Sequence, residues 1–85
     1  MPRFPRSQLF DSTREIVHFV AYVDDQQIAC AISLEALHDR FDGDLQKPVQ
    51  TFILNRTAIE RLATNLIARQ RFEKDGSILI RTADC

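Results

Sequence analysis

The sequence predicts an α+β fold, in which a three-stranded, mainly antiparallel sheet carries two helices packed on one face. Three observations lead to this prediction. Two neighbouring β-rich segments are joined by a polar turn, apolar residues then recur at helical spacing, and a short β-rich segment follows. The expected order is β-β-α-α-β, with the helices covering one face of the sheet. The 85 residues suffice for one small core, so residues 1–85 are expected to form a single α+β domain.

Residues 1–12 are expected to form an extended N-terminal arm. Pro2 and Pro5 lack a backbone donor, and each disfavours a helix before it. The apolar residues of the arm are expected to pack against the rest of the domain; they are Phe4, Leu9 and Phe10.

The first two strands are expected at residues 15–23 and 27–33, which are rich in β-branched and aromatic side chains. Residues 24–26 form a polar turn between them, so the two segments are expected to pair as a hairpin. Side chains alternate between the two faces of a strand. One face therefore receives Val17, Phe19, Ala21, Val23, Ile28, Cys30 and Ile32.

Two helices and a third strand are expected after the hairpin. Ser33 is a suitable N-cap for a short helix, and Gly43 is expected to end it in a left-handed conformation. Pro48 suits the first turn of a long helix, which is expected to run unbroken from Val49 to Arg71. Residues 77–82 read as the third strand. The expected core is Val17, Phe19, Ile28, Cys30, Ile32, Leu37, Phe41, Phe52, Ile59, Leu62, Leu66, Ile78 and Ile80.

Several short motifs along almost the whole chain resemble one bacterial protein family. They are Arg3-Phe4-Pro5, Val17-His18-Phe19, Cys30-Ala31-Ile32-Ser33 with Ala36-Leu37, Phe52, Asn55-Arg56 with Ile59, and Ile80-Arg81-Thr82-Ala83-Asp84. The family is known as domain of unknown function 1488. The resemblance implies a compact α+β domain of bacterial origin. It implies no activity and no catalytic residues, because the family has no established function.

Composition and charge favour a cytoplasmic protein. The chain is 45% hydrophobic and 27% charged, which is ordinary for a globular protein. No apolar run approaches the roughly 20 residues that span a bilayer, and the opening MPRFPRSQLF has no continuous apolar run of a secretory signal. Two cysteines are too few for a typical disulfide scaffold, so both are expected as reduced thiols.

No constellation of residues points to catalysis, a metal or a cofactor. His18 and His38 are twenty residues apart, without the close ligand pairs that are typical of zinc sites. Cys30 is expected to be buried without an adjacent base, and Ser33 is explained as a cap. The two glycines, Gly43 and Gly76, stand too far apart for a phosphate-binding loop. We therefore expect no enzyme activity, no metal and no cofactor.

The second face of the expected sheet is the most interesting surface. It carries an apolar group of side chains with two polar ones and has no helix left to cover it. An uncovered apolar patch of this kind often marks an interface. The alternative is that the arm folds back over it. The possible interaction face consists of Ile16, His18, Val20, Tyr22, Ala29, Ala31, Leu79 and Arg81.

Two functions are carried forward. The first is a non-catalytic protein-interaction or self-association domain, with a homodimer or another protein as partner and no membrane contact. The alternative is a nucleic-acid-associated regulatory protein that uses Arg61 and Arg69 on the long helix. Net charge is −1, but residues 1–44 sum to −4 and residues 45–85 to +3, so nucleic acid is disfavoured without being excluded. A small-molecule sensor has only His18, Tyr22 and Arg81 to support it.

Overall fold

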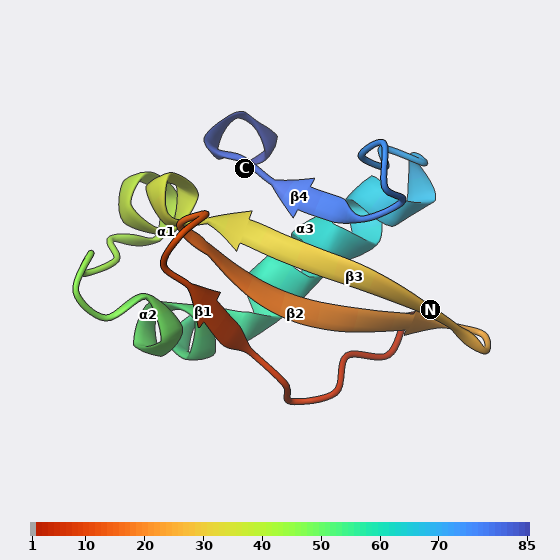
Figure 1. The fold of residues 1–85 in the computed structure, drawn as a ribbon, viewed down its shortest axis with the longest axis horizontal. Helices are drawn as coiled ribbons and strands as arrows, with labels where there is room; N and C mark the ends of the chain where they lie inside the picture. The colour runs from red at the N-terminus through yellow and green to blue at the C-terminus, as the bar shows by residue number, and fades with distance from the viewer. Residues whose placement is uncertain (1) are drawn as a thin grey trace.

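The computed structural model describes residues 2–85, which form a mixed sheet with helices on one side (Figure 1). The sheet contains four strands in the order β1-β2-β3-β4. The first three strands pair antiparallel, and β4 pairs parallel to β3. In chain order the elements are β1 (Leu9–Asp11), β2 (Ile16–Val23), β3 (Gln26–Ser33), α1 (Leu34–Phe41), α2 (Pro48–Leu54), α3 (Arg56–Ala68), β4 (Ile78–Ile80) and a 3₁₀ turn (Thr82–Asp84).

The α+β class is confirmed, but the sheet has four strands rather than three. The additional strand, β1, comes from the expected arm and pairs antiparallel with β2, with Phe10 opposite Val17. The arm makes a second contact further along the same edge, where Arg3 and Tyr22 exchange two backbone hydrogen bonds of 2.8 Å. Tertiary pairing thus gives strand structure to a three-residue segment that carries too few residues for a recognisable alternation.

The hairpin register confirms which side chains share a face. Val17 lies opposite Ile32 and Phe19 opposite Cys30, while His18 lies opposite Ala31. Directly opposed residues in an antiparallel pair project to the same side of the sheet. The hydrophobic face predicted from alternation is therefore the face that packs against the helices.

The prediction of one unbroken helix from Val49 to Arg71 is wrong. The helix is interrupted at Asn55, whose φ of −117° and ψ of 20° are not helical, and α3 ends at Ala68. The Asn55 side chain donates to the carbonyl oxygen of Thr51 at 2.9 Å. Asparagine side chains compete with the backbone for such bonds and thereby favour helix ends. The sheet is consequently covered by α1, α2 and α3 rather than by two helices.

The core lies between the sheet and these three helices. Phe52 of α2 and Ile59 of α3 are fully buried, and the Phe52 ring lies 5.1 Å from that of Phe19. Of the expected core residues, Phe41 and Leu62 are only partly buried and pack at its margin. The buried cluster is Val17, Phe19, Ala21, Ile28, Cys30, Ile32, Ala36, Leu37, Phe52, Ile59, Ala63, Leu66, Ile78 and Ile80.

Two helix-end predictions have different outcomes. Ser33 caps α1 as expected, because its hydroxyl accepts from the amide of Ala36 at 3.0 Å. The left-handed residue after α1 is Asp42, with φ 52°, and not Gly43. Gly43 is needed for another reason: a Cβ there would lie 2.8 Å from the carbonyl oxygen of Leu37.

Candidate functional site

The sheet face opposite the core carries no helix. All three helices contribute to the single buried cluster on the other side, and Figure 1 shows α3 passing behind the strands. We call the uncovered side the open face. Its residues are those expected from strand alternation, namely Ile16, His18, Val20, Tyr22, Ala29, Ala31 and Leu79, with Arg81 directly after β4. Ile16 and Ala31 are nevertheless buried, each with 6% of its surface exposed, whereas the other members are partly or fully exposed.

The arm lies at the edge of the sheet and does not cover the open face. Phe10 and Phe4 pack against the core, with the Phe4 ring centroid 6.1 Å from that of Phe19. Leu9 pairs with His18 and is 69% exposed on the open side. Because Phe10 stands opposite Val17, alternation sends the aromatic ring to the core side and Leu9 to the other.

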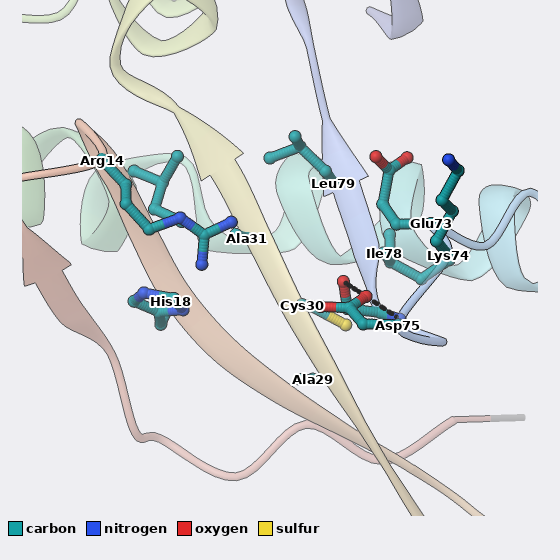
Figure 2. A pocket seen from close by; sticks show the side chains of 12 residues that line it. Arg14, His18, Ala29, Cys30, Ala31, Glu73, Lys74, Asp75, Ile78 and Leu79 are labelled. Carbon is teal, nitrogen blue, oxygen red and sulfur yellow. Dashed lines mark hydrogen bonds between the residues drawn. The ribbon is translucent and has the colours of Figure 1, made fainter.

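A shallow hollow of about 490 Å³ lies in the middle of the open face. The sheet register explains it, because His18 of β2, Ala31 of β3 and Leu79 of β4 form one row across three strands. Small alanine side chains on the central strand thus lie between larger ones on both neighbours. Ala29 continues the floor of the hollow along β3 (Figure 2).

Charged side chains border the hollow on two sides. Arg14, from the turn between β1 and β2, projects from one side, and Asp75, from the loop between α3 and β4, lies on the other (Figure 2). Within residues 2–85, Arg14 and Asp75 form no ion pair with each other or with a third residue. Two opposite charges therefore face the same hollow, and neither is held in an ion pair within the described residues.

Asp75 is fixed by the turn that leads into β4. Its Oδ1 accepts from the hydroxyl of Ser77 at 2.6 Å and from the Ser77 amide at 2.9 Å. The side-chain hydrogen bond from Ser77 lowers the pKa of Asp75 most, the Ser77 amide adds to this, and the charge of Arg14 makes a smaller contribution. Asp75 therefore remains ionised at neutral pH.

The remaining charged residues beside Asp75 are Glu73 and Lys74. Arg81 holds Glu73 through two hydrogen bonds of 2.8 and 3.2 Å. The side chain of Lys74 makes no hydrogen bond or ion pair in the part of the chain that the structure describes. The Glu73 charge is thus locally compensated, whereas that of Lys74 is not.

His18 has a partner on the neighbouring strand. Its Nε2 lies 3.3 Å from Oδ2 of Asp11. The backbone amide of Arg14 lowers the pKa of Asp11 most, and the hydrogen bond with His18 lowers it further. Across residues 2–85, no group of three or more histidine, cysteine, aspartate or glutamate side chains is placed to hold a metal ion. This pair is therefore best understood as an edge contact between β1 and β2.

Tyr22 lies near the far end of the open face. The guanidinium carbon of Arg3 is 5.6 Å from the centre of its ring, and its hydroxyl donates to Gln27 at 3.2 Å. The Arg81 side chain donates a hydrogen bond to Glu73, beside β4. The structure does not bring His18, Tyr22 and Arg81 together into one pocket, since only His18 of these three lines the hollow.

The two arginines proposed for nucleic acid lie elsewhere. Arg61 is exposed on α3 and Arg69 is exposed directly after its last residue, and α3 packs on the side of the sheet away from the hollow. Arg56, by contrast, is engaged with Gln8 at 2.6 Å and with Glu60 at 3.8 Å.

Sequence reasoning missed Arg14, Lys74 and Asp75 as neighbours of the hollow. They come from two turns that are about sixty residues apart along the chain and meet only because β4 inserts beside β3. The sequence holds only a partial signal, because charged residues in the turns before β2 and β4 lie near the ends of those strands. The missing information was the position of β4 in the sheet.

The fold and the site define a small α+β protein with a one-sided helical layer and an exposed, hollowed sheet face. The chain belongs to the family described as "Protein of unknown function (DUF1488)", whose model matches residues 3–80. It is 36% identical over 75 residues to the uncharacterized protein YrdB of Escherichia coli K12, covering 87% of this chain and 88% of that one. The YrdB protein of Shigella flexneri matches with the same values.

A solved structure confirms the fold. The crystal structure of a DUF1488 protein of unknown function from Shewanella loihica PV-4 matches with a TM-score of 0.84 at 23% identity, covering 93% of this chain and 90% of that chain. Within residues 2–85, no helix has the length and apolar character needed to cross a membrane.

Proposed function

We propose that this protein is a non-catalytic interaction domain that binds a protein partner through the open face. The observation that carries the proposal is the one-sided helical layer, which leaves Val20, Ala29 and Leu79 without cover from the same chain. Apolar sheet faces with a polar rim are typical of protein interfaces. The rim here is charged, through Arg14 on one side and Asp75 on the other.

The chemistry of Cys30 gives no support to nucleophilic catalysis. Burial raises the pKa of the Cys30 thiol to about 12, and the residue is 1% exposed. Reactive cysteines need a lowered pKa and partial exposure. The position of Cys30 thus gives no support to a role as a catalytic nucleophile. We also expect the protein to work in the cytosol, where thiols such as Cys30 and Cys85 stay reduced.

The test compares two substitutions in affinity capture from a bacterial lysate. Ala29→Glu places a charge on the exposed floor of the hollow, and Thr57→Glu places the same charge on the exposed side of α3. We expect proteins retained by the wild type to be retained by Thr57→Glu and lost with Ala29→Glu. Circular dichroism checks that both variants fold. Equal capture by all three proteins would contradict the proposal.

A second candidate function uses α3 as a nucleic-acid surface. It is supported by Arg61 on α3 and Arg69 directly after it, which are exposed and form no ion pair within residues 2–85. Phosphate contacts through arginine would make binding strongly salt-dependent. Fluorescence anisotropy with mixed DNA and RNA at low salt tests this. The double variant Arg61→Glu/Arg69→Glu should abolish binding while the fold survives. Absent or salt-insensitive binding would remove this candidate.

A further inference from the structure

We propose that the occupant of the open face is a second copy of this chain, with Arg14 of each copy paired to Asp75 of the other. This inference rests on the proposed function, because it names the partner of the same surface. It is carried by the placement of these two opposite charges on either side of one hollow.

Both Arg14 and Asp75 have unused hydrogen-bonding capacity. Arg14 carries five guanidinium N–H donors, and its side chain makes no hydrogen bond in the described part of the chain. Asp75 uses only Oδ1, which accepts twice from Ser77, so Oδ2 is left for another donor. A guanidinium and a carboxylate of this kind form the strongest charge-assisted pairs in proteins.

Two-fold symmetry would double the contact between Arg14 and Asp75. When two copies of a surface meet about a two-fold axis in the interface, a residue i that contacts j guarantees the reverse contact. An axis that bisects the line from Arg14 to Asp75 therefore makes two identical pairs at once. Arg14 and Asp75 are complementary to each other across this axis, whereas a partner of one sign would leave one of them opposed by a like charge. Lys74, whose charge is also unpaired within residues 2–85, lies beside Asp75 and reduces this complementarity.

The volume of the hollow and the area of the open face determine what kind of dimer can form. The hollow of about 490 Å³ gives room for the long Arg14 side chain of a facing copy, because its floor consists of Ala29 and Ala31. Two strands of eight residues and two of three, with about 3.3 Å per residue and about 4.8 Å between strands, outline a face of roughly 350 Å². Stable interfaces bury about 800 Å² per partner, so a weak dimer is expected, with dissociation in the micromolar range or above.

Charge-swap variants in sedimentation velocity test the pairing. The wild type should associate reversibly at high concentration, and added salt should weaken the association. Arg14→Asp presents two acidic groups and Asp75→Arg two basic ones, so each alone should weaken self-association by about tenfold or more. Their equimolar mixture should associate again, because each supplies what the other has lost.

Two control variants separate the loss of the ion pair from local unfolding and from a general change of surface charge. Asp75→Asn removes the charge but keeps an oxygen that can accept from Ser77, and it should weaken association as Asp75→Arg does. Arg61→Asp makes the same charge change on exposed α3 and should leave association unchanged.

Three results would overturn the inference. They are a wild type that stays monomeric at about 1 mM, single swaps that associate like the wild type, and a mixture that fails to recover while both variants are folded. The proposed function is judged separately: capture of other proteins that is lost in Ala29→Glu, from a wild type that stays monomeric, would retain the open face as an interface and reject only the second copy as its occupant.

Discussion

Arg81 and Glu73 form a two-point ion pair that joins the end of β4 to the loop before it, with nitrogen–oxygen distances of 2.8 and 3.2 Å. The hydrogen bond from Arg81 lowers the pKa of Glu73 most strongly. The pair holds the loop that carries Lys74 and Asp75 beside the hollow. It also explains why Asp75, rather than Glu73, presents the uncompensated negative charge.

The first prediction concerns this pair. Arg81→Ala should raise the pKa of Glu73 toward its ordinary value, because the donor that stabilises the carboxylate is removed. Since the folded-state pKa is lowered, the stabilisation is present above the unfolded pKa of about 4.3 and is lost as the pH falls through the folded pKa. Carbon-detected NMR titration of the glutamate carboxyls measures the shift. An unchanged Glu73 pKa in Arg81→Ala would show that the pair does not persist in solution.

The second prediction concerns the two thiols. Burial raises the pKa of Cys30 to about 12. Partial burial also raises the pKa of Cys85, but this residue is exposed and therefore accessible to a reagent. A disulfide reagent at pH 8 should therefore modify Cys85 quickly, and Cys30 only after unfolding by urea. Cys85→Ser should remove the fast phase completely. Fast modification of Cys30 in that variant would contradict its buried position on β3.

The third prediction concerns Gly43. A Cβ at this position would lie 2.8 Å from the backbone oxygen of Leu37 and 2.8 Å from Cγ2 of Thr51. Backbone atoms cannot move aside cheaply, so Gly43→Ala should lower the free energy of unfolding by about 1–3 kcal/mol. Urea denaturation measures the change.

Gly76→Ala tests the other glycine, where φ is 86° but no atom lies within 4 Å of the added Cβ. Its cost should come from backbone strain alone.

The fourth prediction concerns the centre of the core. Phe52 is fully buried and packs against Phe19, while the guanidinium carbon of Arg56 lies 5.2 Å from the centre of its ring. Phe52→Ala should cost about 3–5 kcal/mol of unfolding free energy through lost burial and a cavity. Ile53→Ala is the matched control, because Ile53 on the same helix is 46% exposed. Similar losses for both variants would place α2 in a different orientation.

The local features of the fold were predictable from sequence. Strand alternation gave both faces of the hairpin, and Ser33 was recognised as the N-cap of α1. These features depend on neighbours along the chain. The break at Asn55 was missed because the apolar periodicity continues across it, whereas the interruption lies in the backbone angles of Asn55, whose side chain donates to Thr51. Strand β1 was missed because three residues carry too little pattern to be recognised.

The site was predictable only in part. The apolar side chains of the open face follow from alternation, but the charges beside the hollow do not. Arg14 and Asp75 become neighbours of one hollow because β4 lies next to β3, parallel to it. No local signal in the segment from Ser77 to Arg81 states which strand it will join. The charged border of the face is thus a consequence of topology.

The measurement that tests the open face most directly is site-specific photo-crosslinking in living bacteria. A benzophenone side chain replaces Ala29 on the open face in one variant and Thr57 on α3 in the other, since both positions are exposed. We expect a discrete protein adduct from position 29 and only background from position 57. An adduct of twice the 9.8 kDa chain mass would identify a second copy. No adduct from position 29 above the background of position 57 would contradict the account.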